Sequence, residues 1–448
     1  MNYVPHTEHD LKEMLREIGV ADVEELFSVI PEQVKLKGSL NLSEPLSEPQ
    51  LMKHMKALAG ENADSNNYSC FLGAGVYKHF IPAVIDAIIS RSEFYTAYTP
   101  YQPEVSQGTL QAIFEYQTLI CQLTAMELSN ASLYDGASGL AEAVLMARRI
   151  TGRNKVLISS ALHPEYAQVV RTYCKNLPIE LMEIPFNEEG ATSLSSAESL
   201  IDSDTASVVL QSPNFFGVIE DIEGGAKVAH SQEAIHIQVI TEPISLGLLK
   251  PPGEMGVDIA VGEGQSLGLP LNFGGPYLGF IATLDKYKRS LPGRLAGQTL
   301  DVEGQEGYVL ALATREQHIR RAKATSNICT NQALCALAAC IYLSWLGKEG
   351  LKEMAYHNLQ KAHYALEELS KVKGCKPKFS GSFFNEFVLE FDRHPEAILN
   401  DLLSKNIIAG LKLKGFYPSL KNCLLLCVTE LLSKEDIDNL VTEMKRII

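Results

Sequence analysis

The chain has 448 residues, of which 46% are hydrophobic and 21% are charged, and this composition predicts a soluble globular protein with one large and one smaller core. Its net charge is −15 with the acidic residues spread along the chain, so nucleic acid and anionic membranes are unfavourable partners. The nine cysteines are odd in number and include no C-x-x-C pair, which indicates reduced, mostly buried thiols in a cytoplasmic protein and no metal site.

Residues 1–65 predict an N-terminal helical arm. Apolar residues recur at helical spacing along one face of its first helix: Leu11, Met14, Leu15 and Ile18. Thr7 and Asp10 have the spacing of a capping box at its start. The polar, acidic beginning does not have the pattern of a signal peptide. Because so short a segment cannot bury a core of its own, we expect the arm to wrap over the main domain or over a partner.

Residues 66–330 alternate short apolar runs with helical stretches, which predicts a large α/β domain with a mostly parallel sheet covered on both faces. The expected strands lie in the runs NASLYDG, NKVLIS, IELMEIPF, SVVLQSP, IHIQVITEP and VDIAVGEG. A long helical stretch is expected to begin near residue 315. Residues 331–448, with the runs FFNEFVLEF and NCLLLCVTE and a final helix, predict a smaller C-terminal α+β domain. The most apolar helix, Ala333 to Leu346, is too short to span a bilayer.

The segment FYTAYTPYQPEVSQG, residues 94–108, predicts an extended loop rich in hydrogen-bonding side chains. Loops of this kind carry binding more often than packing, although tyrosines at an interface are the alternative. The candidate site residues of this tyrosine loop are Tyr98, Tyr101, Gln102, Glu104 and Gln107.

A turn of small residues joins a strand to a helix at residues 135–139. Backbone N–H groups at such a helix N-terminus can bind an anion such as phosphate, with Ser138 in the turn. The same turn needs a helix cap, which Asp135 or Ser138 can supply. Both interpretations stay open.

Three further positions have the pattern of a pyridoxal-phosphate site without its lysine. His163 follows a strand where it could lie on a cofactor ring, although a loop histidine before a helix that begins with proline has the same pattern. Glu242 follows another strand, where an acid would pair with the pyridinium nitrogen. Gln265 lies 23 residues further on, where the Schiff-base lysine is expected. Its amide is not nucleophilic, so it cannot form an imine.

The segment TREQHIRRAKATSNICTNQAL, residues 314–334, concentrates basic side chains in an otherwise acidic protein. A solvated helix face and a clamp for carboxylates both explain this pattern. The candidate residues of this basic segment are Arg315, Ser326, Asn327 and Thr330.

Four long motifs resemble the glycine decarboxylase (P-protein) family of the glycine cleavage system: YTPYQPEVSQG, QSPNFFGVIED, GLLKPPGEMGVDIAVGEGQSLGLPLNFGGPYLG and TREQHIRRAKATSNICTNQAL. More narrowly, they resemble subunit 1, the alpha subunit, of the form divided over two chains. The resemblance covers almost the whole chain. It implies the aspartate-aminotransferase-like fold of type I pyridoxal-phosphate enzymes, with a mostly parallel large-domain sheet and a smaller C-terminal α+β domain.

The same resemblance implies that a beta subunit (subunit 2) binds pyridoxal 5'-phosphate through its own lysine, which matches Gln265 here. Glu242 then stands where a cofactor-binding member of the fold has aspartate. The degenerate cofactor positions of this chain would be Ser138, His163, Glu242 and Gln265. Residues of the tyrosine loop and the basic segment would complete the active site of the beta subunit.

The resemblance also implies the partners of the reaction. Glycine would be the substrate, and lipoylated H-protein would accept the aminomethyl group after decarboxylation. The T-protein and L-protein would be linked functionally, and two alpha and two beta subunits would form a heterotetramer.

Two alternatives differ from this hypothesis. The chain could be a structural or regulatory partner of the beta subunit that never touches substrate, in which case loop substitutions would leave turnover unchanged. It could also be an independent pyridoxal-phosphate enzyme that uses another lysine, such as Lys250 or Lys286.

Overall fold

The computed structural model of the protein describes residues 5–328 and 330–448. Contacts within the chain define two compact units, residues 1–62 and residues 63–448. Both larger sheets lie in the second unit. The boundaries expected near residues 65 and 330 stay predictions.

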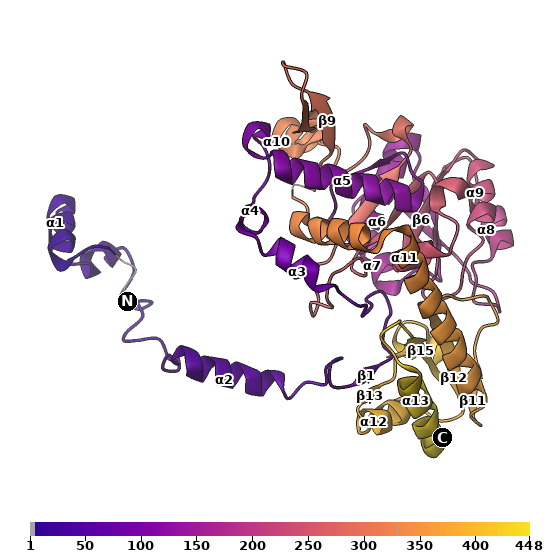
Figure 1. The fold of residues 1–448 in the computed structure, drawn as a ribbon. Coiled ribbons are helices and arrows are strands. Elements are labelled where there is room, and N and C mark those ends of the chain that lie inside the picture. Colours follow the sequence, from indigo (N-terminus) through magenta and orange to yellow (C-terminus); the bar gives the residue numbers. More distant parts are fainter. Residues whose placement is uncertain (1–4, 329) are drawn as a thin grey trace. The chain divides into compact units, whose positions relative to one another are not determined.

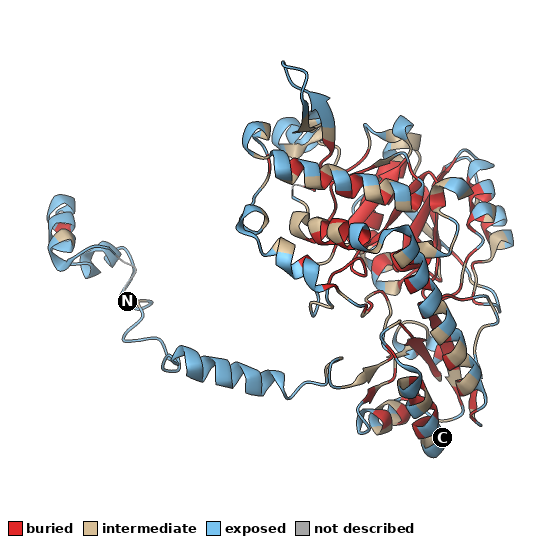
Figure 2. Ribbon diagram, in the orientation of Figure 1, coloured by how far each residue is buried: buried red, intermediate tan, exposed pale blue. Residues whose placement is uncertain are grey.

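Between residues 5 and 62, the N-terminal arm contains two helices and a short 3-10 turn: α1 (Glu8–Ile18), η1 (Glu24–Phe27) and α2 (Glu48–Ala59). The capping box is confirmed, since the Thr7 backbone N–H donates to Asp10 Oδ2 over 2.7 Å and the Asp10 N–H donates to Thr7 Oγ1 over 3.3 Å. Of the apolar face of α1, Leu15 is buried, while the other three expected members are exposed. Every residue of α2 is exposed as well (Figure 2). The apolar surface of the arm therefore stays largely uncovered within residues 5–62.

Within the described residues, the main sheet has seven strands in the order β2-β8-β7-β6-β5-β3-β4. Figure 1 labels its strand β6. Strands β3 to β7 run parallel, and β8 pairs antiparallel with β7 and β2. Their bounds are β2 (Leu128–Ser129), β3 (Lys155–Ser159), β4 (Glu180–Ile184), β5 (Thr205–Gln211), β6 (Ile235–Ile240), β7 (Ile259–Glu263) and β8 (Gly279–Thr283). This arrangement confirms the mostly parallel sheet of the α/β class. The prediction of a strand in NASLYDG, residues 130–136, is wrong. Ser132 has a φ of 135°, which is not extended, and Leu133 forms only an isolated bridge to Gly279.

Helices cover both faces of this sheet, each over its own hydrophobic cluster. One face packs against α3 (Ala83–Ile89), α5 (Gln107–Thr124), α8 (Leu194–Leu200), α9 (Ile222–His230) and α11 (Ala333–Ser370). The other face packs against α6 (Gly136–Thr151) and α7 (Pro164–Cys174). Strands buried on both faces are typical of parallel sheets, and they explain the continuous apolar runs in the sequence.

A second, antiparallel sheet has the order β11-β12-β15-β14, with β11 (Cys375–Pro377), β12 (Glu386–Phe391), β15 (Cys423–Cys427) and β14 (Leu411–Lys412). It packs with α12 (Pro395–Leu403) and α13 (Lys434–Ile447) around a core of its own. The strand β1 (Ser69–Cys70) pairs with β13 (Ile407–Ile408). A hairpin, β9 (Ala296–Leu300) and β10 (Glu306–Leu310), and the short helix α4 (Ser92–Tyr95) complete the unit.

The helix α11 consists of two helical segments that meet at Gly347, whose φ of 59° and ψ of −173° are not helical. Within the described residues, it is the one helix long and apolar enough to cross a membrane by length and composition alone. Half of its most apolar 18-residue stretch is buried inside the protein. Ala336, Ala339 and Tyr342 of this helix belong to the main core. Packing thus accounts for its apolar character.

The long helix expected from residue 315 is wrong. A single turn, α10 (Gln317–Arg320), is followed by Arg321 with a φ of 52°, and the next long helix begins only at Ala333. The guanidinium of Arg315 donates to the carbonyl oxygens of Leu291 and Gly293, which fixes this segment as a loop on the main unit. In this segment, hydrogen bonds to distant residues outweigh the local preference for a helix.

Candidate functional site

The four residues that the resemblance implies as degenerate cofactor positions lie at the carboxyl-end side of the main sheet. Glu242 follows β6, Gln265 follows β7, His163 caps the N-terminus of α7 after β3, and Ser138 lies in the first turn of α6. All four residues are buried. Ligands of open α/β sheets bind at these carboxyl ends of parallel strands.

Gln265 is bound to another segment of the same chain. Its Oε1 accepts a hydrogen bond from the Tyr77 N–H over 2.9 Å, and its Nε2 donates to the Tyr77 carbonyl oxygen over 2.9 Å. A third bond runs from Nε2 to the carbonyl oxygen of Leu269 over 2.8 Å. The amide side chain therefore holds residue 77 from both sides, as a neighbouring strand would.

Glu242 makes an ion pair with His79. Nε2 of His79 lies 2.9 Å from Glu242 Oε2, and Nδ1 lies 2.7 Å from Glu430 Oε2. Burial by itself lowers the pKa of His79, but the charges of Glu242 and Glu430 and their hydrogen bonds outweigh it and raise the pKa to about 10. His79 is therefore an imidazolium between two carboxylates at neutral pH.

His163 contacts the same segment of chain. Its Nδ1 accepts from the Glu165 N–H over 3.2 Å, so Nε2 carries the proton and donates to the Ala74 carbonyl oxygen over 2.9 Å. Burial lowers the pKa of His163, which keeps the ring neutral. A Cβ on Gly75 would lie 2.8 Å from its Nε2, so the peptide packs tightly against the ring.

The N-terminus of α6 resolves the two interpretations of the turn at residues 135–139. Asp135 is the cap, since its Oδ1 accepts from the Ser138 N–H over 2.7 Å. The Gly136 N–H donates to Glu263 Oε2 over 3.0 Å, and Glu263 Oε1 accepts from the Leu278 N–H over 2.8 Å. An internal carboxylate thus occupies the anion position of this helix.

Pyridoxal phosphate does not fit this site. Lysine is missing at Gln265, the ring acid Glu242 is paired with His79, and Glu263 holds a backbone N–H group that would bind phosphate. Lys250 is not a substitute, because it is half-exposed and pairs with Glu223. Lys286 is also largely exposed and lies beside Asp258 and Tyr287.

We predict that Gly75→Ala destabilises the protein by about 1–3 kcal/mol, because φ at this position is +99° and the new Cβ would clash with His163. Urea unfolding followed by circular dichroism measures this change. Gly152→Ala is the matched control: its φ is also positive, at +71°, but no atom lies within 4 Å of the added Cβ. Equal losses in the two variants would contradict a clash with the ring.

A second polar cluster joins the tyrosine loop to the basic segment through Arg294. Its Nη2 donates to the Tyr101 hydroxyl over 3.1 Å, and its Nη1 donates to Thr99 Oγ1 over 3.3 Å. Arg294 is buried, its Nε lies 3.8 Å from Glu316 Oε2, and Nη1 lies 3.5 Å from Asn331 Oδ1. The ring of His318 contacts that of Tyr101 edge-on, with centroids 5.9 Å apart. The two candidate segments are therefore adjacent.

The other candidates of these segments divide into exposed and structural residues. Tyr98 is 84% exposed, and Gln102, Glu104, Asn327 and Thr330 are exposed as well. Gln107 is structural, because its amide exchanges two hydrogen bonds of 2.8 Å with the backbone of Tyr308. The guanidinium of Arg315 donates its hydrogen bonds to backbone carbonyl oxygens, so this residue does not form the expected clamp for carboxylates.

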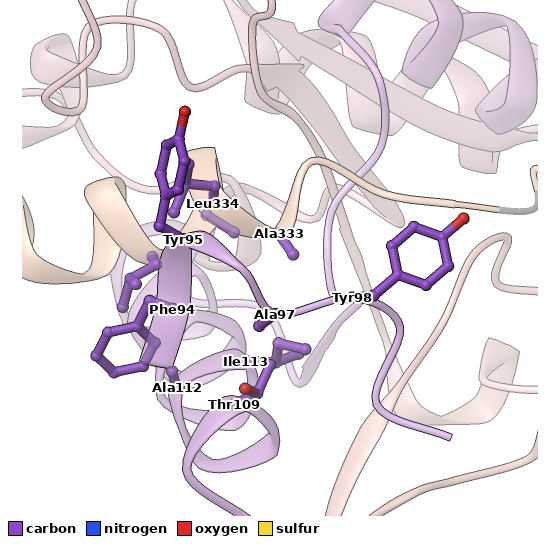
Figure 3. A pocket seen from close by; sticks show the side chains of 11 residues that line it. Phe94, Tyr95, Ala97, Tyr98, Thr109, Ala112, Ile113, Ala333 and Leu334 are labelled. Carbon is purple, nitrogen blue, oxygen red and sulfur yellow. The ribbon is translucent and has the colours of Figure 1, made fainter. Parts of the chain in front are cut away.

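The apolar side of the tyrosine loop borders a cavity of about 70 Å³, lined by residues of α4, α5 and α11 such as Phe94, Ile113 and Leu334. Figure 3 shows the ring of Tyr98 extending away from these side chains. The volume of this cavity is far smaller than the ~300–1,000 Å³ of ordinary ligand sites. The ring of Tyr98, 84% exposed, is therefore accessible to a partner surface.

Comparison with known proteins places the whole chain in one family. The model of the family described as "Glycine cleavage system P-protein" matches residues 1–444. The chain belongs to this family.

The similar proteins agree with this assignment. The chain is 55% identical over 447 residues to the "Probable glycine dehydrogenase (decarboxylating) subunit 1" of Desulfitobacterium hafniense, covering 100% of both chains. It is 54% identical over 441 residues to the protein of the same name from Carboxydothermus hydrogenoformans, covering 98% of each. A crystal structure of glycine decarboxylase (P-protein) of the glycine cleavage system, in inhibitor-bound form, matches with a TM-score of 0.90 at 45% identity and full coverage of both chains.

More distant structures show the fold of this P-protein family member. A sphingosine-1-phosphate lyase from Burkholderia pseudomallei matches with a TM-score of 0.66 at 13% identity, covering 93% of each chain. A NifS-like protein matches with a TM-score of 0.64 at 11% identity, covering 84% of this chain and 98% of the other. The type I pyridoxal-phosphate enzyme fold is confirmed.

The sequence analysis did not identify several polar residues that the structure places at the sites of this P-protein family member. Arg294 occurs in the short motif PGR, whose glycine and proline gave no sign of a buried guanidinium. His79 and Glu430 belong to segments 351 residues apart, so only the folded chain pairs them. Glu263 could have been noticed, because a carboxyl group at the last position of a buried strand needs a partner.

Proposed function

We propose that this chain is the alpha subunit of glycine dehydrogenase (decarboxylating) and that it acts only with a second, cofactor-bearing chain. The observation that carries the proposal is the full-length match to proteins named as subunit 1 of this enzyme. The name "subunit 1" itself implies a partner subunit. The missing lysine at Gln265 agrees with a partner that binds the cofactor.

In the proposed complex, the beta subunit holds pyridoxal phosphate, which acts as an electron sink when glycine loses CO2. The aminomethyl group then passes to the lipoyl arm of H-protein. The T-protein and L-protein act after this step, and the assembly contains two copies of each subunit in the cytoplasm.

The part of this chain is to complete the partner's active site with the tyrosine loop. Arg294 donates to the Tyr101 hydroxyl oxygen, so the hydroxyl proton is left free to point away from the guanidinium. A hydroxyl that accepts a charge-assisted hydrogen bond becomes a stronger donor itself. The loop thus offers a positioned donor to a negatively charged group of the partner's site. The backbone bonds of Gln107 hold the base of the loop in place.

The arm and the tyrosine loop supply the interface of the proposed complex. Within its own unit, the arm leaves apolar side chains uncovered, among them Ile18, Val29 and Leu42. Exposed apolar surface of this extent marks an interaction site. A partner that binds only the folded state would also stabilise it.

We predict that the chain and its partner subunit, when produced together, elute as one assembly that decarboxylates glycine. Neither chain alone has this activity, because each holds only part of the site. Size-exclusion chromatography and release of labelled CO2 measure the two properties, and each separately purified chain is the control. A monomeric alpha chain whose melting temperature is unchanged by the partner would contradict the proposal.

A further inference from the structure

We propose that residues 74–79, together with Glu263, form a built-in substitute for the cofactor, which fills the pocket at the strand ends and joins the two sheets. The inference goes beyond the proposed function, since it concerns how this chain folds without a ligand. It holds whichever protein is the partner.

The first part of the substitute is the ring of His79. Its imidazolium is a planar aromatic cation with an N–H that points at Glu242 Oε2 over 2.9 Å. A protonated pyridine ring would present the same features to an acid in this position. The side chains of His79 and Glu242 are both only 2% exposed, so each needs the other charge as its partner.

The second part is the carboxylate of Glu263 at the N-terminus of α6. It accepts the N–H of Gly136, which is one of the orphan donors at this helix end. Burial raises the pKa of Glu263 to about 7, against the backbone hydrogen bonds that it accepts from Gly136 and Leu278. The carboxyl group of Glu263, supplied by β7, occupies the place that favours a phosphate in cofactor-binding turns.

The third part is the tie between the segment and the loop after β7. Gln265 holds the backbone of Tyr77 through two hydrogen bonds, at the position where a lysine would hold a cofactor covalently. His163 holds the segment at Ala74, at the position of the ring stack. Gln265, His163 and Glu242 thus each contact a group of residues 74–79 in place of a bound cofactor.

The substitute also links the two sheets of residues 63–448. His79 bridges Glu242, which follows β6 of the seven-stranded sheet, and Glu430, which follows β15 of the four-stranded sheet. From β12 of the smaller sheet, Glu386 accepts the Ala74 N–H over 2.6 Å and the Tyr77 hydroxyl over 2.8 Å. Removal of the His79 imidazolium should therefore weaken the contact between the two sheets.

The first experiment is chemical rescue of the His79→Ala full-length chain. We expect its melting temperature to fall by about 5 °C, because two buried carboxylates lose their cation. Imidazole should restore much of this loss, since it can enter as imidazolium. Pyrazole, which has the same shape but stays uncharged at neutral pH, should not. The fluorescence of Trp345, the single tryptophan, reports the event locally, because its ring lies 6.3 Å from that of Phe80.

His236→Ala is the matched control. His236 is also buried, but burial lowers its pKa to about 4, so this ring is neutral at pH 7. Imidazole and pyrazole should act equally on that cavity. If His79→Ala is recovered only from cells grown with imidazole, this counts as rescue. Equal action of the two compounds on His79→Ala, or no effect of the substitution, would overturn the proposal.

The second experiment tests whether the pocket is closed to the cofactor itself. Pyridoxal phosphate is added to the wild-type chain and to Gln265→Lys, followed by borohydride and mass spectrometry of the peptide that contains position 265. Wild-type Gln265 cannot form an imine and serves as the blank. We expect no reduced adduct at this position in Gln265→Lys either, since the backbone of Tyr77 lies at hydrogen-bond distance from residue 265 and Glu242 is paired with His79. An adduct at position 265 of the Gln265→Lys variant would show that the pocket is open and that the proposal is wrong.

Discussion

Replacement of Tyr101 by phenylalanine is expected to lower glycine decarboxylation by the assembled complex roughly ten- to a hundredfold. The change removes one hydroxyl whose oxygen lies 3.1 Å from Arg294 Nη2. Loss of one hydrogen bond to a charged group costs about 1.5–3 kcal/mol. If the hydroxyl donates to a charged species in the partner's site, this cost appears in turnover.

Assembly and cofactor content should remain unchanged in Tyr101→Phe, because the ring is retained and its edge contact with His318 does not need the hydroxyl. Decarboxylation rate, co-elution with the partner and pyridoxal-phosphate content of the complex are measured together. Tyr356→Phe is the matched control, since this tyrosine has the same exposed fraction, 53%, and lies on α11 outside the loop.

Glu104→Gln extends the test to the exposed carboxylate of the same loop. Reduced turnover with intact assembly in both variants supports a loop that reaches the reacting groups. Full activity of both would favour the alternative in which the chain is a structural partner only.

The stability of the alpha chain is expected to fall as pH rises from about 7 to 9, by roughly 1.4 kcal/mol per pH unit from His79 alone. The pKa of His79 is 6.5 in the unfolded chain and about 10 in the fold. Its contribution to stability is therefore fully present below pH 6.5 and is lost as pH rises through 10. Tyr77 and Tyr342 also lie near these charges, but burial raises their pKa values far above this window.

Two buried carboxyl groups, Glu386 and Glu263, also lower the stability as pH rises, but in the range from 4.5 to 7. Burial raises the pKa of Glu386 to about 7, against hydrogen bonds from Ala74 and Tyr77, and burial raises the pKa of Glu263 to about 7 as well. Because their folded pKa values lie above the unfolded value of 4.5, both groups favour the fold less as pH rises from 4.5 to 7. All three groups therefore shift the optimum of stability toward acid.

Urea unfolding at a series of pH values measures these contributions. His79→Gln should flatten the slope between pH 7 and 9 relative to the wild type. His236→Gln should leave that slope unchanged, because the pKa of His236 is lowered to about 4 and its titration affects stability only below pH 6.5. A wild-type slope that survives His79→Gln would exclude the buried imidazolium.

Much of the architecture is readable from the sequence because its signals are local. Continuous apolar runs predicted the parallel strands β3 to β7, and the pair Thr7 and Asp10 predicted the capping box. The motif around Gln265 predicted both the family and the loss of the lysine. The strand and capping signals depend on neighbours within a few residues, whose side-chain period or hydrogen bonding is set by the local backbone. The family is indicated by the resemblance of the motifs.

The tertiary structure alone decided what replaced the cofactor and what holds the tyrosine loop. His79 meets Glu430 across 351 residues of sequence, and Arg294 meets Tyr101 across 193. No periodicity encodes such pairs, because a buried charge can be satisfied by any opposite charge that the fold brings within reach. The sequence by itself determined that position 265 carries glutamine and no lysine, and the folded chain decided that Gln265, His163 and Glu242 contact residues 74–79 of the same chain.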